Sequence, residues 1–152
     1  MIERDDSMWF EVNASGINIK LQVSGYRPTN KDNWDSEWCK CDFSFSSGDW
    51  LNYHKENDEI LLCSEIEELE STLTMLLNGE INEDREISFI EPDFVFNISP
   101  IKNIQNLVLD IMTEWKVYFW HDGLTANYLS ITLNRDEIQK LRDYLSYIIK
   151  KH

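Results

Sequence analysis

Residues Glu114 to Gly123 read Glu-Trp-Lys-Val-Tyr-Phe-Trp-His-Asp-Gly, and this stretch decides the fold. In a strand, alternate side chains point to opposite faces of the sheet. Trp115, Val117 and Phe119 therefore share one face, while Tyr118 and Trp120 share the other. Large apolar groups on both faces indicate either a strand covered on both sides or a strand that carries an aromatic binding surface. The Asp122-Gly123 pair then predicts a turn.

The composition describes a compact acidic protein. The chain has 152 residues, of which 42% are hydrophobic and 12% aromatic, so we expect a single domain over 1–152 with one core. Its 28 acidic and 14 basic residues give a formal charge of −14. This charge disfavours nucleic acid and anionic membranes as partners. It points to a basic protein partner, with solubility alone as the other interpretation.

The sequence favours a cytoplasmic location. The first eight residues, Met-Ile-Glu-Arg-Asp-Asp-Ser-Met, carry charges where a signal peptide needs an apolar segment. No segment has the roughly 18 uninterrupted apolar residues of a membrane span. The chain has three cysteines, and an odd number fits a reducing compartment better than a disulfide framework.

Several segments alternate apolar and polar residues with the two-residue period of a strand. Residues 17–24 alternate in this way and follow a predicted hairpin at Ala14-Ser15-Gly16. The segment 38–45 places Cys39, Cys41, Phe43 and Phe45 on one face. Further strands are expected at 59–63, 86–90, 94–98, 107–112 and 128–133, the one at 107–112 either continuing into the opening stretch or breaking near Thr113.

Two amphipathic helices are predicted. The first follows Ser64, which forms a capping box with Glu67, and it ends at Asn78-Gly79. The second follows Asn134, which repeats the capping pattern with Glu137. Each has an apolar stripe at helical spacing, made of Ile66, Leu69, Leu73, Leu76 and Leu77 in the first helix and of Ile138, Leu141, Leu145, Ile148 and Ile149 in the second.

Together these elements predict an α+β fold: an antiparallel β-sheet of about six to eight strands with two amphipathic helices packed on one face. One helix-covered face leaves the other face of the sheet partly free for binding. We therefore expect Trp115, Val117 and Phe119 in the core, and Tyr118 and Trp120 on the opposite face.

The sequence gives no pattern typical of catalysis or of a cofactor. Cys39, Cys41 and Cys63 lack the paired spacing of zinc ligands, and the first two share a strand face with phenylalanines, so they indicate buried hydrophobes. No serine or cysteine is placed to act with a histidine. The glycines stand singly at turns, without a phosphate-binding loop. We expect a protein that is not an enzyme and holds no metal or cofactor.

Acidic and aromatic residues alternate in and beside the loops around Trp34 and Trp50. Aromatic groups anchor protein interfaces, and carboxylates attract Lys and Arg of a partner. The alternative is a solvated loop whose tryptophans fold back onto the core. The predicted partner-binding residues are Asp32, Trp34, Asp35, Glu37, Asp49, Trp50, Tyr53, Trp120, His121 and Asp122.

The segment Trp34-Asp35-Ser36-Glu37-Trp38, followed by an alternating strand, a capped helix, more strands and a terminal helix, resembles the WapI-type immunity proteins. The Trp-Asp-x-x-Trp element of that family maps onto Trp34, Asp35 and Trp38. This chain differs by a longer segment from Gly48 to Glu59 and by its aromatic run. The resemblance implies a cytoplasmic, non-enzymatic protein, encoded beside a bacterial toxin, that binds and blocks that toxin, often a basic nuclease.

Two other functions stay open at this point. One is a small-ligand binding or enzymatic domain that uses Trp120, His121 and Asp122 at the mouth of a pocket. The other is an interaction domain that completes a sheet edge by dimerising, so that the chain is either a monomer or a homodimer.

Overall fold

The computed structural model describes residues 8–14, 16–24, 26, 38–48, 51–89, 94–121 and 126–150. Its contacts group the chain into two compact units. Unit one contains residues up to Ile66 together with those from Tyr144 onward, and unit two contains Glu67–Asp143. Each unit is built on an antiparallel four-stranded sheet.

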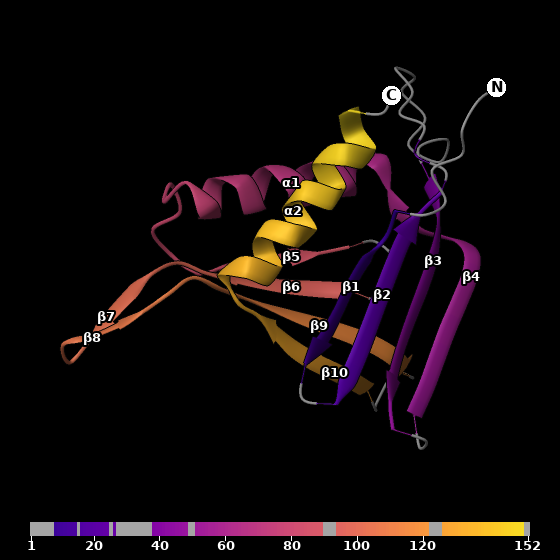
Figure 1. The fold of residues 1–152 in the computed structure, drawn as a ribbon, viewed down its shortest axis with the longest axis horizontal. Coiled ribbons are helices and arrows are strands. Elements are labelled where there is room, and N and C mark those ends of the chain that lie inside the picture. Colours follow the sequence, from indigo (N-terminus) through magenta and orange to yellow (C-terminus); the bar gives the residue numbers. More distant parts are fainter. Residues whose placement is uncertain are drawn as a thin grey trace. The chain divides into compact units, whose positions relative to one another are not determined.

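The sheet of unit one follows the chain order. It consists of β1 (Phe10–Ala14), β2 (Ile17–Val23), β3 (Trp38–Ser47) and β4 (Leu51–Leu62), each paired with the next. The predicted hairpin between β1 and β2 is confirmed, and its Gly16 has a φ of +80°, a conformation that glycine adopts without strain. The sheet is drawn in indigo to purple in Figure 1.

One face of this sheet is buried, because the apolar side chains of neighbouring strands are in register. Phe10 lies opposite Leu21, which lies opposite Phe43, and Ile19 lies opposite Phe45. Cys39, Cys41, Phe43 and Phe45 are all at most 1% exposed, as their alternation predicted. The partners on the other face of β3 are half-buried or exposed.

The sheet of unit two is also a meander, with one insertion. It consists of β5 (Arg85–Ser88), β6 (Phe94–Ser99), β9 (Met112–His121) and β10 (Ala126–Leu133), in the order β10-β9-β6-β5. Between β6 and β9 the chain forms a separate two-stranded hairpin, β7 (Lys102–Ile104) and β8 (Leu107–Leu109). The hairpin extends away from the four-stranded sheet in Figure 1.

Trp115 forms the centre of the buried face in unit two. Its ring stacks on Phe96 with centroids 5.0 Å apart and meets the edge of Phe94 at 5.2 Å. Trp115 and Val117 are both 0% exposed, so their predicted place in the core is confirmed. Tyr118 is half-buried, while the side chains of Phe119 and Trp120 lie outside the described residues.

Both predicted helices are present, as α1 (Cys63–Leu77) and α2 (Arg135–Lys150). At the start of α2, Asn134 Oδ1 accepts a hydrogen bond from the Glu137 backbone N–H, and Glu137 Oε1 accepts one from the Asn134 N–H, both at 2.9 Å. This reciprocal pair is the predicted capping box. In the apolar stripes, Leu77 and Ile149 are half-buried and the other predicted residues are buried.

The start of α1 differs from the prediction. The helix begins at Cys63, and Glu65 Oε1 accepts the Leu62 N–H at 2.9 Å, so the capping pair lies two residues earlier than Ser64 and Glu67. Glu65, in the first turn of the helix, is only 7% exposed, because its carboxylate turns back to satisfy that backbone donor.

The predicted stop of α1 is confirmed. The Glu80 N–H reaches the Met75 carbonyl at 2.9 Å, and the Gly79 N–H reaches the Leu76 carbonyl at 3.2 Å, with Gly79 at a φ of +75°. These two bonds form a Schellman motif, which needs a residue in the left-handed region.

The α+β class is confirmed, but the single sheet is replaced by two four-stranded sheets and a hairpin. Each meander buries its own apolar face. By contacts, α1 from Glu67 belongs to unit two, whereas α2 passes into unit one at Tyr144. The packing of both helices on one sheet face stays a prediction. The single domain over 1–152 remains a prediction.

Two strand predictions are also corrected. The expected short strand at 59–63 is the end of the twelve-residue β4, which pairs with β3 in regular register from Leu51 to Lys55 and with two register irregularities between Lys55 and Leu61. Glu56, Asp58 and Glu59 therefore lie in a strand rather than in loops. Residues 107–112 are divided between β8 and the first residue of β9, with the break before Met112 rather than near Thr113.

Candidate partner-binding surfaces

Tyr53 is the predicted binding residue whose side chain the structure describes. It lies in β4 opposite Phe45, and the two rings stack with centroids 4.9 Å apart and an interplanar angle of 17°. Tyr53 is half-buried, so much of its ring supports the core of unit one. For Trp120 and His121 the structure describes the backbone but not the side chains. The other predicted residues lie outside the described residues: Asp32, Trp34, Asp35, Glu37, Asp49, Trp50 and Asp122.

The sheet of unit two has a half-exposed face opposite Trp115, which we call the outer face. It is formed by alternate residues of β6, β9 and β10 that the strand register brings together. Asn97 lies opposite Glu114, Lys116 lies opposite Ser130, and Tyr118 lies opposite Tyr128. The expectation that the face opposite the core would be partly free is met in this sheet.

Glu114 is held on the outer face by two neighbours. Ser130 Oγ donates to Glu114 Oε2 at 2.7 Å, and Asn97 Nδ2 donates to Oε1 at 3.0 Å. The hydrogen bond from Ser130 lowers the pKa of Glu114 most, Asn97 and the charge of Lys116 lower it further, and partial burial opposes them. The result is an ionised carboxylate with a fixed orientation.

Aromatic rings lie beside this carboxylate. Tyr118 and Tyr128 have centroids 5.1 Å apart, and Lys116 Nζ lies 5.3 Å from the Tyr128 centroid. Tyr128 is 49% exposed. An ionised carboxylate next to exposed tyrosine is chemistry that binds the lysine and arginine side chains of a protein partner.

The sheet of unit one also has a polar face. A hollow of about 180 Å³ is lined by Lys20, Gln22, Asp42, Phe43, Ser44 and His54. His54 Nε2 lies 3.9 Å from Glu56 Oε2, and both side chains are more than half exposed. Neither the exposure nor the distance favours an activated base.

Within the described residues, no group of three or more His, Cys, Asp and Glu side chains is arranged to hold a metal ion. The three cysteines are buried and free, with Cys39 Sγ and Cys63 Sγ 2.9 Å apart. Neither α1 nor α2, the helices in the described part of the chain, is long and apolar enough to cross a bilayer.

Two surfaces were missed by reasoning from sequence. The Glu114, Ser130 and Asn97 cluster comes from three strands, and only their register places it together. The β7–β8 hairpin had a local signal: Gln105-Asn106 separates two short runs, and asparagine is among the residues that best tolerate positive φ. Both Gln105 and Asn106 adopt positive φ, at 50° and 69°.

Comparison with known proteins gives one result at the level of families. The model of the "Immunity protein WapI-like family" matches residues 10–152. No curated protein matches the chain. The match extends over both four-stranded sheets, both helices and the inserted hairpin. Because it covers nearly the whole sequence, the chain belongs to the WapI-like immunity protein family.

Proposed function

We propose that this protein binds and neutralises a cognate, basic bacterial toxin in the cytoplasm of the cell that makes it, and that it acts by binding rather than by catalysis. The observation that carries the proposal is the family match over residues 10–152. An immunity protein needs a partner, and the physical properties of the chain indicate what kind of partner that is.

Charge supports a basic partner. The formal charge of −14 is shared unevenly: residues 67–143 contain fifteen acidic and six basic residues, which gives unit two −9. The outer face of unit two adds a carboxylate, Glu114, that is already oriented by two hydrogen bonds before any partner arrives. Preorganised charge of this kind accelerates association and fixes register.

The test first identifies a toxin gene next to the gene of this protein and then uses the toxin domain that it encodes. We expect a tight complex by isothermal titration calorimetry, rescue of growth when the two are expressed together, and affinity that falls as salt rises from about 0.05 to 0.5 M. Neutralising Asp32, Asp35 and Asp49 together, each to Asn, is expected to weaken the complex.

The matched control removes the same charge elsewhere, at the exposed helix residues Glu68, Asp136 and Asp143. It is expected to retain most of the affinity, because those carboxylates lie outside the predicted contact. Absence of both binding and rescue would refute the function. Affinity that is indifferent to salt and to all six substitutions would refute the electrostatic mechanism.

A further inference from the structure

The β7–β8 hairpin is a ribbon with its own two-stranded pairing, and none of the other described strands pairs with it. Lys102 lies opposite Leu109, Asn103 opposite Val108 and Ile104 opposite Leu107. Gln105 and Asn106 close it with positive φ, the geometry that suits a two-residue hairpin turn. Its chain position, between the second and third strands of the meander, makes it an insertion into the sheet of unit two.

The hairpin exposes apolar side chains to an unusual degree. Leu107 and Val108 are 66% and 68% exposed, Ile101 and Ile104 are 51% exposed, and Leu109 and Met112 are 39% exposed. Together they leave apolar area on the order of 500 Å² in water, divided between the two faces of the ribbon; the largest apolar patch of a typical monomer has a similar size and is often functional.

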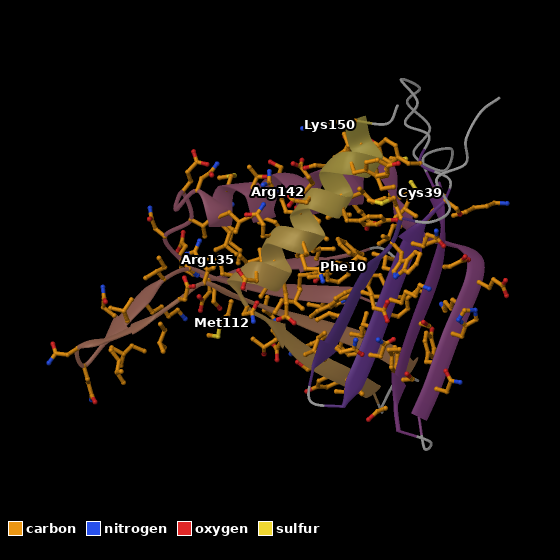
Figure 2. The ribbon with its side chains drawn as sticks, in the orientation of Figure 1. Phe10, Cys39, Met112, Arg135, Arg142 and Lys150 are labelled. Carbon is orange, nitrogen blue, oxygen red and sulfur yellow. The ribbon has the colours of Figure 1, made fainter. Side chains whose placement is uncertain are left out.

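These side chains are on both faces of the ribbon. By alternation, Ile104, Leu107 and Leu109 share one face with Lys102, while Val108 and Asn103 share the other. Figure 2 shows the side chains of the hairpin projecting to both sides. A free two-stranded ribbon is marginally stable in water. Both faces of the ribbon therefore stay largely exposed in the folded chain. A partner that surrounds the ribbon would bury both of them.

The base of the hairpin is held in place by ion pairs. Lys102 Nζ lies 3.0 Å from Asp84 Oδ2, and Arg135 donates to Asp110 from Nε at 3.0 Å and from Nη2 at 2.7 Å. Asp110 Oδ1 also accepts the Ile111 N–H at 2.8 Å. Both ends of the ribbon are thus paired with residues of the same unit, one just before β5 and the other at the start of α2.

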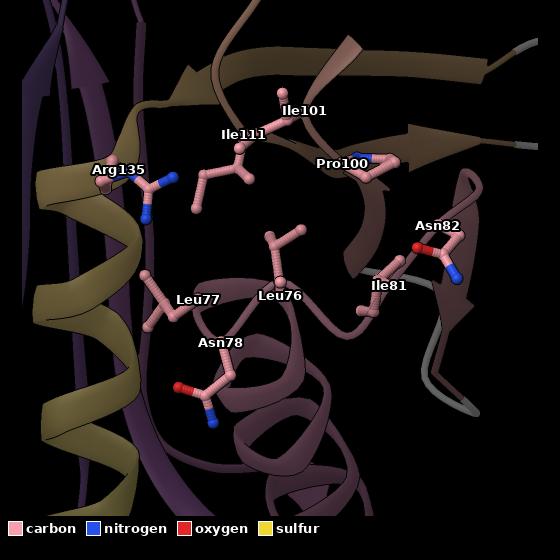
Figure 3. Close-up of a pocket in the computed structure, with 10 residues that line it drawn as sticks. Leu76, Leu77, Asn78, Ile81, Asn82, Pro100, Ile101, Ile111 and Arg135 are labelled. Atoms are coloured by element: carbon pink, nitrogen blue, oxygen red, sulfur yellow. The ribbon is translucent and has the colours of Figure 1, made fainter.

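A hollow lies next to this base. It has a volume of about 340 Å³. It is lined by Ile101, by residues at the C-terminal end of α1 and by residues of the two segments that join the hairpin to the sheet. Figure 3 shows Leu76 and Ile111 pointing toward each other across it, with Arg135 on one side and Pro100 and Ile81 on the other. The hollow has a mixed lining, since the polar residues Asn78, Asn82 and Arg135 border it together with these apolar side chains.

The charges around the hairpin indicate which kind of partner binds it. The cations at its base, Lys102 and Arg135, are each paired with a carboxylate, whereas Glu80 and Glu83 stand exposed on the segment that borders the hollow. Unit two as a whole carries −9. A second copy of this chain carries the same net charge of −14, so charge disfavours self-association and favours a cationic protein.

We propose that the β7–β8 hairpin inserts into an apolar cleft of a basic protein, the toxin of the proposed function, while Glu80 and Glu83 meet the cationic rim of that cleft. This inference rests on the proposed function and adds the surface that makes the contact. The ribbon supplies apolar anchors at the centre of the interface, and the carboxylates supply a charged rim.

The test uses the same toxin domain as the test of the proposed function. It measures the affinity of that domain for three variants of this protein: Leu107→Ser, Val108→Ser and the double variant. Each single change is expected to weaken binding by about tenfold, and the double variant by more. Met8→Ser is the matched control, because Met8 is an apolar residue of unit one with 41% exposure. It is expected to bind like the wild type.

Stability measurements show whether a loss of affinity comes from the lost contact or from unfolding of the variant. Leu107 and Val108 have few neighbours to lose, so denaturation midpoints of their variants should match the wild type, and hydrogen exchange of residues 101–112 should slow in the complex. If the wild type binds and both hairpin variants bind equally tightly, the docking inference is wrong while the proposed function stands. If the wild type does not bind the toxin at all, the proposed function itself fails.

Light scattering tests the alternative that a second copy of the chain, rather than the toxin, binds the hairpin. A wild type that is dimeric and a Leu107→Ser/Val108→Ser variant that is monomeric would show that the hairpin joins two copies of the chain, which would overturn the proposal. A wild type whose mass is that of a single chain, combined with toxin binding that depends on the hairpin, supports it.

Discussion

The phenol oxygen of Tyr144 in α2 accepts a hydrogen bond from the backbone N–H of Val23 at 2.7 Å, although the two residues are 121 positions apart. Both belong to unit one and both are buried. This bond fastens the last part of α2 to the end of β2. The last residues of α2 thus belong to the same compact unit as the first sheet.

Replacement of Tyr144 by Phe tests that fastening. The ring still fills its space, but the buried Val23 N–H loses its acceptor, so we expect the free energy of unfolding to fall by about 1–3 kcal/mol. Urea denaturation followed by circular dichroism measures the change. Tyr128→Phe is the control, because Tyr128 is 49% exposed and its loss of a hydroxyl should cost little. Equal effects of both changes would contradict the role of Tyr144.

Tyr144 also predicts sensitivity to alkali. Burial raises the pKa of Tyr144 above its ordinary value of 10.0, although the hydrogen bond from Val23 opposes that shift. The unfolded chain therefore loses the proton first. The stability from the neutral phenol is fully present below pH 10.0 and is lost as pH rises toward the higher folded pKa. The difference in stability between wild type and Tyr144→Phe should shrink above that pH, and a constant difference would refute the prediction.

The cluster at Glu114 predicts a shifted titration that depends on Ser130. The pKa of Glu114 lies below its ordinary value of 4.5, chiefly because of the Ser130 hydrogen bond. Its contribution to stability is present above pH 4.5 and is lost as pH falls through the folded pKa. Carboxyl NMR titration of Ser130→Ala should give a higher pKa for Glu114. Ser88→Ala, on β5, should leave that pKa unchanged, and a shift in both variants would argue against a local cause.

The capping box at the start of α2 predicts a measurable loss when it is removed. Asn134→Ala eliminates the acceptor for the Glu137 N–H and should destabilise the protein by about 0.5–2 kcal/mol. Asn134→Asp keeps an acceptor oxygen and adds a charge that the helix N-terminus favours, so it should restore the stability. Thermal melts of the two variants provide the comparison. If Ala and Asp have the same effect, the side-chain oxygen of Asn134 contributes nothing.

The proximity of Cys39 and Cys63 predicts a selective disulfide. Their sulfur atoms are 2.9 Å apart, while the Cys41 thiol points to the Cys39 carbonyl at 3.7 Å. Treatment with diamide, which takes up the two hydrogens of the thiols, should join Cys39 to Cys63 after local opening admits the reagent. Peptide mapping identifies the bond, and Cys63→Ser is the control. A Cys39–Cys41 bond in the wild type would show that the described geometry does not govern the reaction.

Much of the local structure could be read from the sequence. The alternation around Trp115 and Phe43 predicted which side chains are buried, and the Asn134–Glu137 and Asn78-Gly79 signals predicted where a helix begins and ends. These features depend on neighbours within a few residues, so a short stretch contains the information. The first cap of α1 was misplaced because Leu62, with no capping side chain, ends a strand there and Glu65 turns inward.

The candidate surfaces were less accessible to sequence reasoning. Tyr53 looked like a loop anchor, yet its ring stacks on Phe45 because β4 extends much further than its last few residues suggested. Glu114 looked like an ordinary strand carboxylate, and its partners Asn97 and Ser130 are 17 and 16 residues away. Leu107 was predicted to lie in a strand of the sheet, and only the structure shows it exposed on a separate hairpin.

The sequence by itself determined the α+β class, the buried faces of the strands, the start of α2 and the end of α1, because periodicity and capping act over one or two turns of chain. The tertiary structure alone decided that the strands form two sheets, that α2 returns to the first of them at Tyr144, and that the β7–β8 ribbon stays outside both. Those outcomes depend on which strands pair across long separations and on which apolar surfaces find a partner within the chain. Pairing and burial are properties of the whole fold, so no short segment encodes them.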